Sequence, residues 1–268
     1  MSDAFTPEES AILMLYVTNA EQPIYALKNL PEEVVAVLFA YYSRSRESLR
    51  RNLLKLIQDQ DIALEAGLHS SSLDEAKLTE AREKARLFHE KWVVGYGHAS
   101  VAEHAVVHLA IEDVSIIASK LIEETRLASY TEKSTRYVLF DEGKFYHVPK
   151  LMQSSYAALY EDTVRLLLRT YATLVPKVVA CVKEHVPRRA TQSERAYETA
   201  CRAKAYDLLR YLLPAATLTN LGLTINARAL EHLLTKLMSH PLEEARDIAM
   251  AMKREAEQVM PTLLKYAD

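Results

Sequence analysis

Residues 95–108, "GYGHASVAEHAVVH", carry several side chains that could do chemistry. His104 and His108 are four residues apart, so a helix would place both imidazoles on one face, where they could bind a metal ion. Glu103 or His98 would supply the further ligands. The acid precedes the first histidine, so this is not the HExxH motif of metalloproteases, and no other carboxylate or histidine has a compelling spacing. A buried histidine hydrogen-bonded to the backbone is therefore favoured over a metal site.

A second segment, "TRLASYTEKSTRY" at 125–137, combines cations with hydroxyl groups. Arg126, Ser134 and Arg136, together with Glu132, could form an anion-binding cradle on a loop. Arginine offers paired donors to a phosphate, and serine adds a hydroxyl. The same residues also suit an ordinary salt-bridged turn between a helix and a strand. Spacing alone leaves both interpretations open.

The composition of the 268-residue chain limits the class of partner. The formal net charge is −3, which predicts no general attraction to nucleic acid or to an anionic membrane. An anionic ligand must therefore be held by local arginines. The two cysteines, Cys181 and Cys201, predict no disulfide framework, and without a signal peptide or apolar span we expect a cytoplasmic protein. Only five glycines occur, which argues against a P-loop or a dinucleotide-binding fold.

The elements that must position these residues are mostly helical. Thr6, Pro7 and Glu9 form a capping-box pattern at the start of a first helix, and Pro31 opens another. The arginines of 44–51 are interpreted as a solvated helix face, with a phosphate or partner surface as the alternative. Residues 72–94 indicate a charged amphipathic helix.

Further along the chain, the apolar stripe from about residue 100 to 124 predicts a helix. Residues 136–148, "RYVLFDEGKFYHV", predict a strand or hairpin. Long helices are expected over 150–213, interrupted near Pro187. An extended stretch after Pro214 leads into a helix near Asn226, and Pro241 opens the last helix. The pattern predicts a helix-rich α+β fold in a single domain, 1–268.

Taken in order, these segments resemble the flavin-dependent thymidylate synthases. That family carries Gly-His-x-Ser/Thr-x-x-Glu-His, then a helix, Arg-His-Arg, seven residues and Ser-x-Arg-Tyr. The resemblance covers about residues 90–245, and residues 1–90 are interpreted as a helical N-terminal extension of the same domain. The matching residues are Gly97, His98, Ser100, Glu103, His104, Arg126, Ser129, Glu132, Ser134, Arg136, Tyr137, Arg210, Leu213, Pro214, Asn226, Arg228 and His240.

The resemblance implies a small mixed or antiparallel sheet and a homotetramer with FAD at its subunit interfaces. It implies reductive methylation of dUMP, or a related uracil nucleotide, to dTMP, with methylenetetrahydrofolate as carbon donor and NADPH as reductant. The flavin carries the difficult chemistry, so no protein nucleophile is needed. The residues that would bind FAD by matching position are His98, Ser100, Glu103, Asn226 and His240. Those that would bind the nucleotide are Glu132, Ser134, Arg136 and Arg210, with Arg126 and Lys236 as catalytic candidates.

The chain departs from the family pattern near the chemistry. Glu124-Thr125 stands where the family has Arg-His, and Leu121 stands where it has a nucleotide-contacting glutamine. The spacing to His240 is one residue short, so the uracil-activating arginine is matched only by Lys236 or Leu237. A carboxylate about 4 Å from a phosphate costs about 4 kcal/mol at an effective dielectric of 20.

These departures leave alternatives open. One is a family member that keeps the fold, and with it flavin or nucleotide binding, without the activity. The other is a metal hydrolase that uses His98, His104 and His108.

Overall fold

The computed structural model describes residues 5–43, 45, 47–58, 102–260 and 263–264. The chain divides into two compact units. The first comprises the described residues of 1–108, 224–239 and 247–268, and the second comprises 109–223 and 240–246. The interpretation of the chain as a single domain stays a prediction. The sequence-predicted helix at 72–94 lies outside the described residues.

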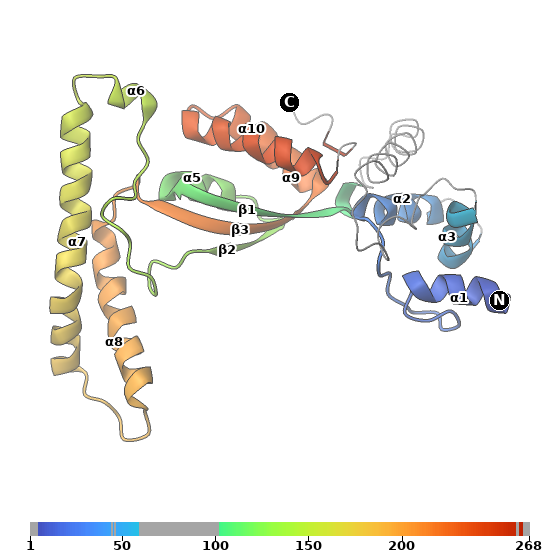
Figure 1. Ribbon diagram of the computed structural model, residues 1–268, viewed down its shortest axis with the longest axis horizontal. Helices are drawn as coiled ribbons and strands as arrows, with labels where there is room; N and C mark the ends of the chain where they lie inside the picture. Colours follow the sequence, from blue (N-terminus) through green and yellow to red (C-terminus); the bar gives the residue numbers. More distant parts are fainter. Residues whose placement is uncertain (1–4, 44, 46, 59–101, 261–262, 265–268) are drawn as a thin grey trace, which may run out of the picture. The chain divides into compact units, whose positions relative to one another are not determined.

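The first unit begins with helices α1 (Pro7–Tyr16), α2 (Glu32–Tyr42) and α3 (Leu49–Gln58) (Figure 1). The predicted capping box is confirmed: the Thr6 hydroxyl accepts a hydrogen bond from the Glu9 amide, and the Glu9 carboxylate accepts one from the Thr6 amide at 2.9 Å. That backbone hydrogen bond lowers the pKa of Glu9. Two of the orphan donors at the start of α1 are thereby satisfied.

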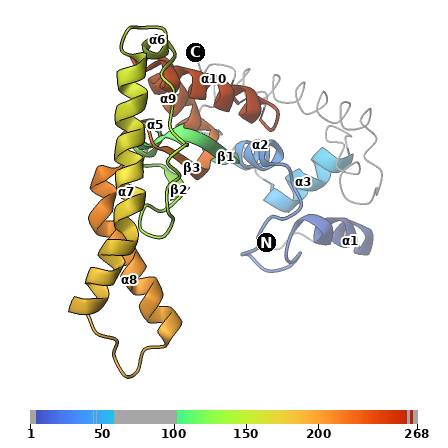
Figure 2. The same ribbon diagram turned by 60° about the vertical axis from the view of Figure 1, so that its left-hand side comes forward.

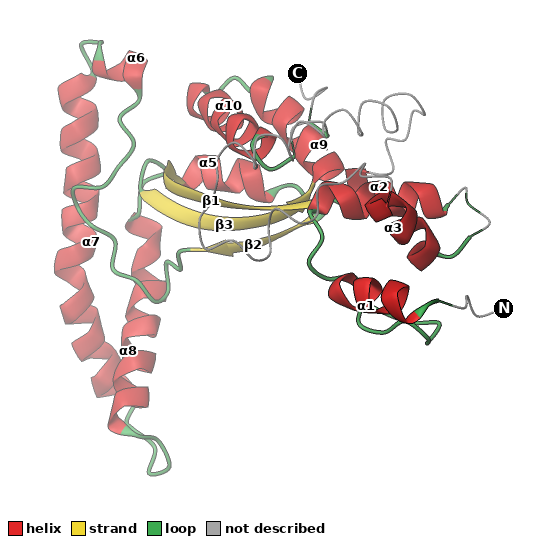
Figure 3. Ribbon diagram, turned by 45° about the vertical axis from the view of Figure 1, so that its right-hand side comes forward, coloured by secondary structure: helices red, strands yellow, loops and turns green. Residues whose placement is uncertain are grey.

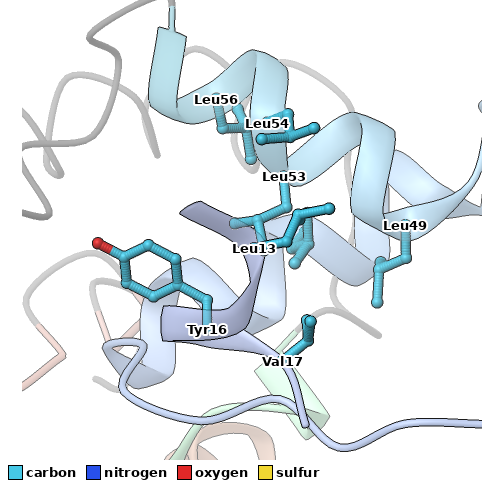
Figure 4. Packing of buried hydrophobic residues seen from close by; sticks show 8 residues of the cluster. Leu13, Tyr16, Val17, Leu49, Leu53, Leu54 and Leu56 are labelled. Atoms are coloured by element: carbon cyan, nitrogen blue, oxygen red, sulfur yellow. The ribbon is translucent and has the colours of Figure 1, made fainter. Parts of the chain in front are cut away.

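The core of these helices consists of leucines with one tyrosine and one valine (Figure 4). Leu13 of α1 and Leu53 of α3 are fully buried. The prediction that the arginines here form a solvated face is wrong for Arg50, which is 8% exposed. Its guanidinium donates to the Asn19 side chain at 3.2 Å and lies 3.7 Å from the centre of the Tyr25 ring. The hydrogen bond to Asn19 and the contact with the Tyr25 ring offset part of the cost of burial, although the buried Nε of Arg50 has no hydrogen-bond partner among the described residues.

A three-stranded sheet runs through the middle of the chain in the order β1-β3-β2 (Figure 3). Near one end of the β1–β3 pair the Ala227 amide donates to the Ala105 carbonyl, and near the other the Ile116 amide donates to the Thr217 carbonyl. The residue number rises on one strand as it falls on the other, so the pair is antiparallel. The strands are β1 (Val106–Ser115), β2 (Ala128–Glu132) and β3 (Leu218–Asn226).

The predicted helix from about residue 100 to 124 is wrong in its first part. Residues of β1 are extended, and only α5 (Ile116–Glu123) is helical. Valines and an isoleucine favour the strand, because β-branched side chains pack well on a pleated surface. Asp113 has a positive φ of 52°, and the buried residues on its two sides, Ile111 and Val114, are three positions apart instead of two. The two-residue alternation is therefore broken, which makes the strand difficult to recognise from the sequence.

A long helical hairpin dominates the second unit, where α7 and α8 lie side by side (Figures 1 and 2). The predicted interruption near Pro187 is confirmed. The predicted hairpin over 136–148 is wrong, because only Phe145 forms a β-bridge, with Thr217, and the rest is turns and irregular chain. The elements are α6 (Pro149–Met152), α7 (Ala157–His185), α8 (Glu194–Leu209) and the 3₁₀ turn η4 (Arg210–Leu212).

The strand-to-helix transition at Asn226 is confirmed. The Asn226 side chain accepts a hydrogen bond from the Ala229 amide at 2.8 Å and so caps α9 (Ala227–Met238). The last helix, α10 (Glu243–Glu257), follows Pro241 as predicted. The helix-rich α+β fold with a small antiparallel sheet is therefore confirmed. No helix among the described residues is long and apolar enough to span a membrane.

Candidate functional site

Two of the arginines predicted to bind the nucleotide meet at one carboxylate. Asp207 of α8 lies 3.5 Å from Nε of Arg136 and 3.3 Å from Nη2 of Arg210, all in the second unit. The two arginine side chains are 55% and 40% exposed, so both keep surface available to a ligand. Two guanidinium charges against one carboxylate leave the cluster positive, as an anion site requires.

Arg136 is held in a turn anchored to the sheet. The Lys133 amide donates to the Asn220 carbonyl of β3 at 2.8 Å, and the Ser134 carbonyl accepts from the Tyr137 amide at 3.2 Å. The Ser134 hydroxyl oxygen also accepts from the Arg136 amide at 3.2 Å. These bonds fix the backbone that carries Ser134 and Arg136, which reduces the entropy lost when a ligand binds.

Glu132, another predicted nucleotide ligand, is held by α5. The Ser119 hydroxyl donates to one of its oxygens at 2.7 Å, and the Lys120 ammonium donates to the other at 3.1 Å. Lys120 also pairs with Glu123 at 2.6 Å. Partial burial by itself would lower the pKa of Lys120, but the two carboxylates raise it overall. The position of Glu132 is therefore set by fixed partners on the neighbouring helix.

The segment Glu124–Arg126 forms the turn between α5 and β2. Glu124 is the C-cap residue that follows α5, and its side chain is exposed. The Tyr130 hydroxyl hydrogen-bonds to the carbonyls of Ile122 at 2.9 Å and Thr125 at 2.8 Å, which ties the turn to β2. Burial is the largest cause that raises the pKa of Tyr130. The side chain of Arg126 is exposed and makes no ion pair with the part of the chain that the structure describes.

The residues of the first unit that are predicted to bind FAD have partners close to them in the structure. Glu103 forms an ion pair with Arg228, which follows the start of α9. Asn226 uses its carbonyl oxygen as the α9 cap, and Lys236 lies exposed in the last turn of that helix. His98 and Ser100, which the sequence also assigns to FAD, lie outside the described residues.

In the second unit, His240 sits in the turn before α10. Its Nδ1 accepts a hydrogen bond from the Leu242 amide at 3.1 Å, and its carbonyl accepts one from Arg246 at 2.7 Å. The ring is thereby oriented, with Nε2 as its remaining polar atom. These bonds give His240 a defined local geometry.

The histidines considered as metal ligands have other contacts. The His104 ring lies 4.7 Å from the Phe39 ring, and His108 Nδ1 lies 2.9 Å from the Thr224 hydroxyl. Among the residues that the structure describes, no group of three or more histidine, cysteine, aspartate or glutamate side chains could hold a metal ion. The expectation that His108 is buried and hydrogen-bonded to the backbone is wrong, because the residue is exposed and its partner is a side chain.

Three residues of this arrangement do not follow from the sequence. Asp207 holds both arginines, while Ser119 and Lys120 hold Glu132. The sequence weakly predicts the contact between Asp207 and Arg210, because the two residues are three positions apart on a predicted helix and this spacing favours contact. No sequence pattern predicts the contacts of Ser119 and Lys120 with Glu132, since these contacts depend on how α5 packs beside β2.

Comparison with known proteins gives one family. The model of the thymidylate synthase complementing protein family, Thy1, matches residues 52–262. A UPF0159 protein of Chlamydia muridarum is 39% identical over 98% of this chain and 50% of its own length. A flavin-dependent thymidylate synthase of Pyrococcus furiosus is 28% identical over 61% of this chain and 59% of its own.

A crystal structure of thymidylate synthase X from Helicobacter pylori, with FAD and dUMP, is also similar. It is 23% identical, covers 68% of this chain and 84% of its own, and has a TM-score of 0.44. The chain spans about half the length of the chlamydial relatives that it matches.

Proposed function

The chain belongs to the thymidylate synthase complementing protein family, and we propose that it methylates dUMP, or a related uracil nucleotide, to dTMP. FAD would be the cofactor, methylenetetrahydrofolate the carbon donor and NADPH the reductant. The observation that carries the proposal is the convergence of Arg136 and Arg210 on Asp207, at positions where the family pattern expects nucleotide ligands.

The nucleotide would bind at this cluster through its phosphate. A phosphate oxygen can replace the long contacts of Asp207, because the guanidinium fork matches phosphate geometry better than a single carboxylate oxygen at 3.3–3.5 Å. The Ser134 hydroxyl would add a donor. Glu132, already oriented by α5, would accept a hydrogen bond from the uracil or sugar.

The chemical types of the described side chains suit a flavin nucleotide. In the first unit, the Arg228 guanidinium and the Asn226 amide nitrogen are donors suited to its phosphates or ring oxygens. In the second unit, Arg126 and His240 offer a cation and an oriented imidazole. When bound, the flavin supplies the redox and one-carbon chemistry. Arg126, in the second unit, would polarise the uracil by placing positive charge where its carbonyl oxygens gain electron density. Lys236, in the first unit, stays a catalytic candidate by matching position alone.

A second candidate function is nucleotide binding without methylation. Glu124 favours it, because its turn is tied down by Tyr130 and so holds an acid where the family has a cation. A carboxylate about 4 Å from a flavin phosphate would cost about 4 kcal/mol at an effective dielectric of 20. That corresponds to almost three decades in affinity.

The assay that separates these functions is dUMP-dependent NADPH oxidation, followed together with dTMP formation, in the presence of FAD and methylenetetrahydrofolate. With the wild-type chain we expect both NADPH oxidation and dTMP formation, and with Arg210→Ala we expect neither. Arg202→Ala is the matched control, because Arg202 is exposed on α8 and makes no ion pair within the described part of the chain. Tight dUMP binding with no dTMP would establish the second function and exclude the first.

We also propose that the chain forms a homotetramer in the cytoplasm. Exposed apolar side chains in the second unit, among them Leu127, Leu159 and Tyr211, support an interface with other copies. Light scattering coupled to size-exclusion chromatography tests this assembly. A mass of one or two chains at micromolar concentration would contradict it.

A further inference from the structure

An open hollow of about 730 Å³ lies in the second unit, along α8 and beside the turn that carries Arg136. Small side chains form its floor, among them Ala200 and Ala203 on successive turns of the helix. Cations and hydroxyl groups border it. The polar and aromatic lining consists of Arg136, Tyr137, Ser193, Arg195, Thr199 and Lys204.

The charges around this hollow favour an anion. Arg195 and Lys204 are exposed, and neither makes an ion pair with any described residue. The acids on the same helix are already engaged: Glu194 pairs with Arg188 at 3.5 Å, and Glu198 pairs with Lys183. Two unpaired cations therefore face a concave surface of a chain whose overall charge is negative, −3.

The hollow is continuous with the proposed phosphate site, because Arg136 belongs to both. Lys204 precedes Asp207 by three residues on α8, which is about 4.5 Å along the helix axis. Lys204 thus lies about one turn from the carboxylate that holds Arg136 and Arg210. A phosphate at the arginine pair would have Lys204 as the next cation along α8. Arg195 lies 12 residues before Asp207, about 18 Å along the helix axis, and is beyond the reach of the same phosphate chain.

We infer that this hollow binds the further phosphates of a nucleoside di- or triphosphate whose first phosphate lies at Arg136 and Arg210. The inference rests on the proposed function, since it extends the same nucleotide site. A monophosphate needs only the arginine pair, and it would leave Lys204 without a ligand. The exposed ring of Tyr137, on the same wall, adds an apolar face beside the phosphate chain.

The test is calorimetric titration of the full chain with dUMP, dUDP, dUTP and inorganic tripolyphosphate at low salt. A contact of unit charges at about 4 Å in high dielectric changes affinity by about fivefold. We therefore expect dUDP and dUTP to bind about fivefold more tightly than dUMP, through the single added contact with Lys204. Raising the salt should shrink this gain, because exposed charges are screened.

Variants show where the gain originates. Lys204→Ala should remove most of the preference for dUTP, while Arg195→Ala and Arg202→Ala should keep it. Equal affinities for dUMP and dUTP in the wild type, or a preference that survives Lys204→Ala, would overturn the inference.

The arms of the titration also separate this inference from the proposed function. If dUMP binds and dUTP binds no more tightly, the hollow is not a phosphate site, although the proposed function stands. If no uracil nucleotide binds but tripolyphosphate does, and Lys204→Ala weakens it, the anion site stands and the proposed function fails. If neither nucleotide nor tripolyphosphate binds, both fail.

Discussion

Replacing Arg136 by alanine separates a binding role from a structural one. The ion pair of Arg136 with Asp207 is long, 3.5 Å, and the arginine side chain is 55% exposed. An exposed pair of this kind contributes about 0–1 kcal/mol to stability. Charge-assisted hydrogen bonds to a phosphate contribute more, about 1.5–3 kcal/mol. Arg136→Ala should therefore weaken dUMP binding by about 10- to 150-fold and change the free energy of unfolding by less than about 1 kcal/mol.

The assay is calorimetric titration with dUMP beside urea unfolding of each variant. Arg210→Ala should give a similar loss of affinity. The two losses should not add in the double variant, because both arginines share Asp207. Arg136→Lys should restore little, since an ammonium cannot make paired hydrogen bonds with a phosphate. Unchanged dUMP affinity in Arg136→Ala, with wild-type affinity in the Arg202→Ala control, would mean that Arg136 does not bind the phosphate of dUMP.

Glu124→Arg combined with Thr125→His should raise FAD affinity by at least about tenfold in a flavin fluorescence titration, because it replaces a negative charge by a positive one. No gain would mean that the divergence extends beyond this turn. Ser115→Ala should destabilise the chain by about 2–3 kcal/mol in urea, since Ser115 caps α5 and its amide and hydroxyl both donate to the buried Glu244. A loss below about 0.5 kcal/mol would contradict that interpretation. Burial raises the pKa of Tyr171 to about 12, so the folded state holds this proton more tightly than the unfolded chain. Stability should then fall as pH rises from about 10 to 12, and Tyr171→Phe should reduce that fall in urea titrations at each pH.

Helix ends are the most predictable features of the fold. The Thr6 capping box and the Asn226 cap are signalled by short local patterns, and the structure shows both. Local hydrogen bonds decide such ends, so no knowledge of tertiary packing is needed. The order of the motifs along the chain is equally informative, because it indicates the family to which the chain belongs.

The sequence predictions that are wrong concern segments whose structure is decided by tertiary contacts and not by the local pattern. The sequence of β1 predicts a helix, because its buried residues do not alternate regularly across Asp113 and its partner strand β3 lies about a hundred residues later. The expected hairpin near Gly143 has strong turn chemistry, but its flanking residues do not pair with one another. Phe145 bridges Thr217 of the distant segment instead.

The candidate site is only partly predictable for the same reason. Arg136 and Arg210 follow from the family pattern, but Asp207, which brings them together, has meaning only once α8 lies beside the turn. Arg50 shows the converse. Its helical spacing with other arginines suggests a solvated face, yet Asn19 and Tyr25 enclose it. A charged side chain is buried where the fold supplies partners, and no local pattern records them.

We propose that this chain still binds a flavin and a uracil nucleotide despite Glu124 and Thr125. The first measurement is a titration of the purified protein with FAD, followed by flavin fluorescence with and without dUMP. We predict saturable binding at micromolar FAD or tighter, with a further change when dUMP is present. No saturable signal at high FAD concentration, with or without dUMP, would contradict the claim and would mean that the fold has lost its cofactor.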